Sequence, residues 1–231
     1  MEGKVVLVAG GTGALGAELC LHFARKRCTV YATTRGRRAT VDQQDPLWNS
    51  IHFITADVAV EGNVLNLFDR ITSECSRIDV VINATGGYLP KKPLTDVSLA
   101  DWERMMESNL KTTFLLTREA VRRMNGQSYG RIINISAMTG LRPTPGYIPY
   151  ALSKHSVSLL TELAAQEVAG SSITINAIAP GVIATDTGGD TSVATARSVV
   201  SPSTIADVID YLCSTAANVI NGTTIRLPGG S

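Results

Sequence analysis

A tyrosine and a lysine four residues apart are the most informative pair in this sequence. Tyr150 and Lys154 occur in the run Tyr-Ala-Leu-Ser-Lys, and on a helix this spacing places both side chains on one face. Free tyrosine has a pKa of about 10, and a nearby ammonium group favours the phenolate, so we expect a tyrosine pKa shifted toward neutrality. Such a phenol could protonate a carbonyl oxygen while hydride reaches the carbon, or act as the base in the reverse reaction. The alternative interpretation is a surface pair without a chemical role.

A glycine-rich turn near the N-terminus points to a nucleotide. Residues 5–9 are the apolar run Val-Val-Leu-Val-Ala, residues 10–16 read Gly-Gly-Thr-Gly-Ala-Leu-Gly, and a helical spacing of apolar residues follows. Strand, glycine turn and helix in this order are typical of a dinucleotide site. Glycines let the backbone approach a pyrophosphate, and the N–H groups at the helix N-terminus attract its charge. A tight turn that binds nothing is the alternative.

Strand-like and helix-like segments alternate along the chain. Strands are expected at residues 4–9, 28–33, 51–55, 80–83, 131–135, 174–178 and 223–227. Helices are expected at residues 14–26, 61–76, 99–124, 149–169 and 203–213. The alternation predicts one α/β domain over residues 1–231, with a Rossmann-type, doubly wound parallel sheet of about seven strands and helices on both faces. A ligand would lie at the carboxyl ends of the strands, where the strand order reverses.

Several polar or turn residues stand where such a ligand is expected. Asn83, Ser136 and Pro180 lie at or just beyond the expected carboxyl ends of strands, and Asn109 lies within the expected helix 99–124. Carboxyl ends of parallel strands share one edge of the sheet, so the first three residues should lie near the bound molecule. Taken singly, Ser136 could be an ordinary turn serine and Asn109 a solvated helix residue.

Together these residues resemble the short-chain dehydrogenase/reductase family, in its shorter, single-domain branch. The resemblance covers essentially the whole chain, and the nearest likeness is to 3-oxoacyl-thioester reductases and similar carbonyl reductases. The residues on which it depends are, in order, Gly10 to Gly16, Asp57-Val58, Asn83-Ala84-Thr85-Gly86, Asn109, Ser136, Tyr150 with Lys154, and Pro180-Gly181.

The resemblance implies a role for each position. Tyr150 would be the acid or base, and Lys154 would lower its pKa and bind the nicotinamide ribose. Ser136 would form a hydrogen bond to the substrate oxygen, and Asn109 would hold a water that links Lys154 to solvent. Besides Tyr150 and Lys154, the implied cofactor-binding residues are Gly10, Thr12, Gly13, Ala14, Leu15, Gly16, Asp57, Val58, Asn83, Ala84, Gly86, Pro180, Gly181, Val182 and Thr185.

The sequence departs from the family pattern at a few positions. Ala9 stands where the family usually has threonine, and Ala14 stands where it usually has glycine, which adds a methyl group beside the phosphate turn. Thr85 lies in the stretch that usually reads Asn-Asn-Ala-Gly. The segment between Gly181 and the expected helix at residue 203 is short for the family, and this segment usually covers the substrate.

The end of the second expected strand favours NADP over NAD. NAD enzymes of this fold place an acidic residue there, on the ribose 2′-hydroxyl. Between Cys28 and Val41 the sequence has no Asp or Glu and instead reads Thr-Thr-Arg-Gly-Arg-Arg at residues 33–38. A guanidinium suits a 2′-phosphate by charge and by geometry, so Arg35 is the expected partner, assisted by Thr34. A solvated basic loop is the alternative.

Composition indicates a globular enzyme of the reducing cytoplasm with a small-molecule substrate. The formal net charge is +1, with 21 basic and 20 acidic residues, so nothing favours nucleic acid or an anionic membrane surface. No long, uninterrupted apolar stretch suggests a membrane span, and the N-terminus has no signal-peptide pattern. The four cysteines are scattered, without the spacing of a metal site or a disulfide framework.

The expected function is the NADP-dependent reduction of a carbonyl compound, such as a ketone or a 3-oxoacyl thioester. Two alternatives remain open: an NAD-dependent alcohol or sugar dehydrogenase, and a protein that senses a dinucleotide without catalysis. By the same family resemblance, the helices at 99–124 and 149–169 would pair across two-fold axes and give a homotetramer.

Overall fold

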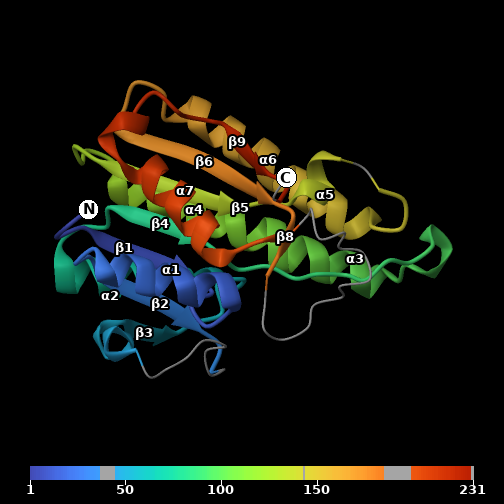
Figure 1. The fold of residues 1–231 in the computed structure, drawn as a ribbon, viewed down its shortest axis with the longest axis horizontal. Helices are drawn as coiled ribbons and strands as arrows, with labels where there is room; N and C mark the ends of the chain where they lie inside the picture. Colours follow the sequence, from blue (N-terminus) through green and yellow to red (C-terminus); the bar gives the residue numbers. More distant parts are fainter. Residues whose placement is uncertain (37–44, 143, 185–198, 230–231) are drawn as a thin grey trace.

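The sheet at the centre of the molecule is parallel and has seven strands, in the order β3-β2-β1-β4-β5-β6-β9 (Figure 1). The computed structural model describes residues 1–36, 45–142, 144–184 and 199–229. The strands of the sheet are β1 (Val5–Ala9), β2 (Thr29–Thr34), β3 (His52–Thr55), β4 (Val80–Asn83), β5 (Gly130–Ile135), β6 (Ile173–Pro180) and β9 (Thr224–Leu227). The predicted fold class, a doubly wound parallel sheet, is confirmed.

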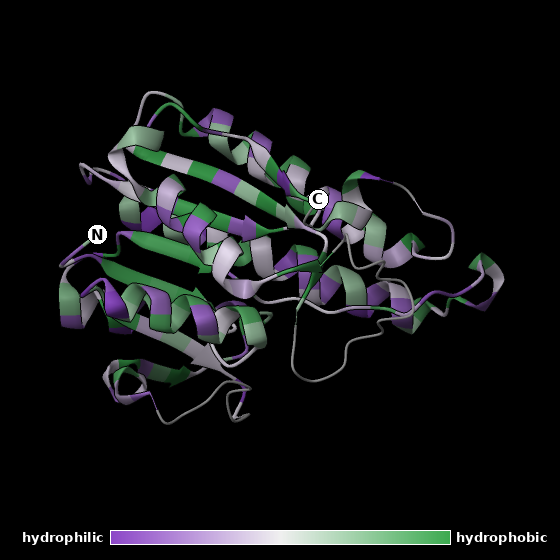
Figure 2. Ribbon diagram, in the orientation of Figure 1, coloured by the Kyte–Doolittle hydropathy of each residue, from purple (hydrophilic) through white to green (hydrophobic). Residues whose placement is uncertain are grey.

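Helices cover both faces of this sheet. They are α1 (Ala14–Arg25), α2 (Glu61–Cys75), α3 (Leu99–Met105), α4 (Thr112–Met124), α5 (Met138–Leu141), α6 (Ile148–Glu167) and α7 (Pro202–Cys213). The first and last of these share one hydrophobic core with the sheet, and α2, α4 and α6 share the other. The inner strands β1, β4, β5 and β6 are therefore buried at every residue, and β1 is a continuous apolar run (Figure 2).

The topology creates a crevice at the carboxyl ends of the central strands. From β1 the chain moves outward to β2 and β3, and then crosses back to β4 on the other side of β1. The register pairs Ala9 with Asn83, so the carboxyl ends of β1 and β4 lie side by side. Connections that leave such neighbouring strands in opposite directions open the crevice in which doubly wound sheets bind ligands.

The expected helix 99–124 is not one regular helix. It consists of α3, a π-helical segment over Met106–Lys111, and α4. A π-helical turn contains an extra residue, and such turns occur frequently at functional sites. Apolar periodicity alone does not reveal an insertion of this kind, and here it contains Asn109.

Short elements complete the structure. The strands β7 (Val182–Ile183) and β8 (Val199–Val200) form a separate parallel pair, and 3₁₀ turns occupy Pro46–Ser50, Leu94–Asp96 and Thr215–Ala217. Together with α5, these elements are too short to give a periodic pattern in the sequence. Within the described part of the chain, no helix has both the length and the apolar character needed to cross a membrane.

Candidate active site

A cavity of about 390 Å³ lies at the crevice between the two halves of the sheet. Nine of the residues expected to bind cofactor line it: Gly10, Thr12, Gly13, Thr34, Arg35, Asp57, Val58, Ala84 and Gly86. The sequence analysis did not identify the remaining lining residues, which are Thr33, Ala56, Ala59, Thr85, Arg104, Glu107, Ser108 and Thr112. Arg104, Ser108 and Thr112 follow one another at intervals of four, which is the one sequence pattern that could have indicated a shared helix face.

The glycine turn has the close packing that a phosphate cradle requires. Gly10 has φ +84°, and a Cβ there would lie 3.1 Å from the backbone of Ala84. A Cβ on Gly16 would lie 2.1 Å from the Gly10 carbonyl oxygen. The turn ends at Gly13, the N-cap of α1, whose first N–H groups therefore face the cavity opening. This arrangement fits the pyrophosphate of a dinucleotide.

Residues that follow β2 and β3 form one wall of the cavity. Thr34 accepts a hydrogen bond from the Gly36 N–H at 3.1 Å, and Arg35 is exposed. Asp57 accepts a hydrogen bond from the Ala59 N–H at 3.0 Å, so its carboxylate stabilises its own turn. Arg37 and Arg38 lie outside the described residues.

Lys154 and Asn109 converge on the chain segment that follows β4. The Lys154 side chain is buried, at 5% exposure, and its Nζ donates to the Ile135 carbonyl oxygen at 2.8 Å. A Cβ added to Gly86 would lie 2.9 Å from Asn109 Oδ1 and 3.1 Å from Lys154 Nζ. Only glycine leaves room for these two polar groups, which accounts for Gly86 in a cavity wall.

Asn109 ties this segment to the helix that contains the tyrosine and the lysine. Its Oδ1 accepts from the Gly87 N–H at 2.9 Å, and its Nδ2 donates to the Gly87 carbonyl at 3.2 Å and to Ser153 Oγ at 2.9 Å. Asn109 therefore fixes the separation between the end of β4 and α6. The expected water link from Asn109 to Lys154 stays a prediction.

The titration of Tyr150 and Lys154 is governed by burial. Burial raises the pKa of Tyr150 to about 12 and lowers the pKa of Lys154 to about 8. The expectation that Lys154 lowers the tyrosine pKa is therefore wrong for this geometry, because the Lys154 ammonium is directed to the Ile135 carbonyl. The Tyr150 ring also meets Tyr88 edge-on, with centroids 5.3 Å apart, and this apolar contact disfavours a phenolate.

Ser136 does not have the geometry that the expected substrate contact needs. Its Oγ donates to the Lys154 carbonyl oxygen at 2.7 Å and accepts from Ser158 Oγ at 2.9 Å. A hydroxyl has a single O–H donor, and here the main chain of α6 uses it. The family resemblance aligned the position but gave no information on where the hydroxyl points.

The remaining expected residues lie around this centre. Asn83 donates to Thr113 Oγ1 at 2.8 Å and is buried, so it attaches the end of β4 to α4. Leu15 and Gly16 are buried within α1, and Ala14 is the first residue of that helix. Pro180, Gly181 and Val182 follow one another across the end of β6 and into β7. Thr185 lies outside the described residues.

Known proteins resemble this chain over nearly its full length. It is 31% identical over 242 residues to the cyclopentanol dehydrogenase of Comamonas sp. (strain NCIMB 9872), with 98% of this chain and 96% of the relative covered. It is also 31% identical over 243 residues to a 3-oxoacyl-(acyl-carrier-protein) reductase of Aquifex aeolicus (strain VF5), with 100% and 98% covered.

A solved structure and a family model agree with these relatives. The structure of ElxO with NADP bound matches with a TM-score of 0.89 at 29% identity, covering 98% of this chain and 97% of that one. The model described as short chain dehydrogenase matches residues 4–195. Because this match includes the glycine turn, the Tyr150–Lys154 pair and most of the sheet, the chain belongs to the short chain dehydrogenase family of oxidoreductases.

Proposed function

We propose that this protein uses NADPH to reduce a carbonyl compound, either a ketone or a 3-oxoacyl thioester, within the single domain of residues 1–231. The observation that supports this most directly is the convergence of Lys154 Nζ and Asn109 Oδ1 on Gly86. Gly86 lies in the wall of the glycine-lined cavity, and Tyr150 lies one helical turn from Lys154. A dinucleotide extended along the cavity would therefore end beside a proton donor and a cation.

Each residue of this site has a distinct task. When bound, the nicotinamide of NADPH supplies the hydride. Tyr150 donates its phenolic proton to the substrate oxygen, and its high pKa keeps that proton in place at neutral pH. Lys154, whose pKa of about 8 leaves it mostly charged at pH 7, holds the ribose hydroxyls. Asn109 keeps the β4 end and α6 at the required separation.

A turnover assay decides between this proposal and its alternatives. Oxidation of NADPH and NADH would be followed against a panel of ketones and 3-oxoacyl thioesters, and the reverse reaction against secondary alcohols and sugars. The proposal expects turnover of carbonyl compounds with NADPH. Preference for NADH and an alcohol or sugar would favour a dehydrogenase, and tight cofactor binding without any turnover would favour a sensor.

The choice of cofactor depends on Arg35. We expect Arg35→Ala to weaken NADPH binding by about tenfold to a hundredfold and to leave NADH binding nearly unchanged, because one charge-assisted pair contributes about 1.5–3 kcal/mol. Arg35→Asp should reverse the preference, since a carboxylate repels the 2′-phosphate and accepts from a 2′-hydroxyl. Apparent constants for both cofactors measure the effect, and salt should reduce it because Arg35 is exposed.

Arg70→Ala is the matched control for this test. Arg70 is an exposed arginine that forms an ion pair with Glu74 on α2, away from the cavity lining. Its removal should leave the NADPH to NADH ratio as in the wild type. An unchanged ratio in Arg35→Ala as well would mean that the basic loop is only solvated.

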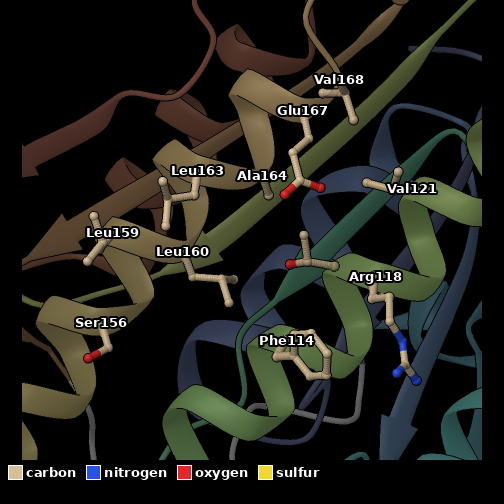
Figure 3. A pocket seen from close by; sticks show the side chains of 11 residues that line it. Phe114, Arg118, Val121, Ser156, Leu159, Leu160, Leu163, Ala164, Glu167 and Val168 are labelled. Atoms are coloured by element: carbon tan, nitrogen blue, oxygen red, sulfur yellow. The ribbon is translucent and has the colours of Figure 1, made fainter.

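Self-association is a second proposal, and it concerns the outer face of α4 and α6. A groove of about 490 Å³ lies between these helices, and apolar side chains from both helices line it (Figure 3). Leu159 and Leu163 are 49% and 52% exposed, and Phe114 is also exposed. Burying such a surface against a second copy removes apolar area from water. We propose a homotetramer with two-fold axes.

Light scattering tests this assembly. The wild-type protein should have the mass of four chains at working concentration, and Leu163→Glu should give smaller species because it puts a charge in the contact. Val219→Glu is the control, because Val219 is the most exposed large apolar residue among those that the structure describes and lies outside the groove lining. A monomeric mass for the wild type would refute the proposal.

The four cysteines also fit a location in the reducing cytoplasm, which we propose on this ground alone. All four are free, and Cys20 and Cys213 are buried. Burial raises the pKa of both of these thiols, which keeps them protonated and unreactive.

A further inference from the structure

Two consecutive residues, Ile135 at the end of β5 and Ser136 directly after it, form hydrogen bonds to the side chain and the main chain of Lys154. The Ile135 carbonyl oxygen accepts from Lys154 Nζ at 2.8 Å, and Ser136 Oγ donates to the Lys154 carbonyl oxygen at 2.7 Å. Ser136 itself is attached to the sheet, because its N–H donates to the Ile178 carbonyl at 2.7 Å. The position of the ammonium group is therefore defined by β5, not by α6 alone.

A second serine closes this arrangement. Ser158 lies one helical turn after Lys154, and its Oγ donates to Ser136 Oγ at 2.9 Å. Ser136 is 2% exposed and Ser158 is 8% exposed, so water does not compete for either hydroxyl. Because Ser158 donates to it, the Ser136 hydroxyl uses its only proton on the Lys154 carbonyl.

The neighbouring backbone leaves this turn of α6 little freedom. A Cβ on Gly140 would lie 2.7 Å from the His155 nitrogen and 2.8 Å from the Lys154 carbonyl carbon. The short helix α5 thus packs backbone to backbone against the turn that contains Lys154. The residue after Ser136 is Ala137, which is buried and has no polar side-chain atom.

We propose that Ser136 is a positioning residue that acts through Lys154, and that Tyr150 binds the substrate oxygen without the Ser136 hydroxyl. This inference rests on the proposed reductase function, because it concerns how that site is assembled. It assigns to Ser136 an effect on cofactor binding, since Lys154 holds the ribose, and no direct effect on the substrate.

Ser136→Ala separates the two roles. Loss of one net hydrogen bond should raise the NADPH dissociation constant by about 3- to 10-fold and lower kcat by a similar factor, with the KM for the carbonyl substrate unchanged within twofold. Fluorescence titration with NADPH gives the first quantity, and steady-state kinetics give the others. If Ser136 contacts the substrate oxygen instead, NADPH binding will stay normal, and kcat/KM for the carbonyl substrate will fall by about 10²-fold or more.

Ser158→Ala, alone and combined with Ser136→Ala in a double variant, provides an independent test of the role of Ser136. Ser158→Ala should weaken NADPH binding in the same direction as Ser136→Ala, because it removes the bond that orients the Ser136 hydroxyl. The double variant should be no worse than Ser136→Ala, since both changes break one chain of hydrogen bonds. Additive losses, or normal NADPH binding in Ser158→Ala, would overturn the proposal, and this arm remains available if Ser136→Ala folds poorly.

A control variant and the NADPH titrations distinguish failure of the Ser136 proposal from failure of the proposed function. Ser73→Ala removes a hydroxyl that donates to the Arg70 carbonyl on α2, a bond of the same kind away from the site, and it should change neither quantity. A wild-type protein that binds NADPH without reducing any carbonyl compound would count against the proposed function. The NADPH titrations of the variants would still decide the role of Ser136 in that case.

Discussion

Replacing Tyr150 with phenylalanine should abolish most of the reductase activity while NADPH still binds. Phenylalanine keeps the ring and its edge contact with Tyr88, with centroids 5.3 Å apart in the wild type, so the fold and the cleft should be preserved. Only the proton donor is lost. A positioned general acid typically contributes about 10²–10⁴-fold, and we expect a loss of kcat in this range, measured by NADPH oxidation at saturating substrate.

Two further measurements make this result specific to the phenol. The NADPH dissociation constant of Tyr150→Phe should agree with that of the wild type within a few-fold. Tyr211→Phe removes a hydroxyl from an exposed tyrosine on α7 and should leave kcat unchanged. Turnover near the wild-type level in Tyr150→Phe would assign the proton to a different group.

Replacing Lys154 with methionine should change how stability depends on pH. Burial lowers the pKa of Lys154 from 10.5 to about 8 in the folded protein. Between these values the unfolded chain binds more protons than the folded chain, so this lysine makes the wild type more stable as pH rises. Methionine has no proton to lose. Relative to Lys154→Met, the wild type should therefore gain up to about 3 kcal/mol in free energy of unfolding between pH 7 and pH 10.5.

The informative quantity is how the difference in free energy of unfolding between the wild type and Lys154→Met changes with pH. The value of this difference at a single pH contains two opposing contributions. Near pH 7 methionine removes a buried charge, which is stabilising, but leaves the Ile135 carbonyl without its donor, which is destabilising. Titrations shared by both proteins cancel in the difference. Urea unfolding across the pH range gives the slope, with Lys91→Met, an exposed lysine, as the control. A difference that stays constant from pH 7 to pH 10.5 would show that Lys154 is not held in a desolvated state. Lys154→Met should also lose activity.

Much of the fold could be predicted because the apolar residues in the sequence of an element are the residues that the fold buries. The β1 run Val5–Ala9 is buried at every residue, so its uninterrupted apolar sequence indicated a central parallel strand. The glycine turn could be identified because Gly10 and Gly16 tolerate no side chain. The helix that contains Tyr150 and Lys154 was also evident from the sequence. At Gly16 the required residue type is determined by a contact near in sequence, with the Gly10 carbonyl, whereas Gly10 itself meets the distant Ala84.

The parts that could not be predicted depend on contacts between distant segments. The Ser136 hydroxyl points to α6 because the fold brings residue 136 next to residues 154 and 158, which are distant from it in the sequence. The pKa values of Tyr150 and Lys154 follow from burial, which their spacing does not reveal. Arg104 enters the cavity wall through the packing of α3 over the crevice. For Ser136, Tyr150 and Lys154 the family resemblance supplied the positions but not the orientations, and for Arg104 it supplied neither.

The π-helical turn at Met106–Lys111 interrupts a continuous helical segment, residues 99–124, that lines both the nucleotide cavity and the outer groove. An extra residue rotates everything beyond it by about 100° relative to a regular helix. Arg104 before the turn, Ser108 within it and Thr112 directly after it line the nucleotide cavity, and further along α4, Phe114 and Val121 line the groove on the outer side of the molecule. Deleting one residue within the turn would make the helix regular and would rotate Phe114 and Val121 by about 100° relative to Arg104. With α3 held in the cavity wall, this rotation would turn the apolar face of α4 out of the groove, so the extra residue sets the orientation of one surface relative to the other.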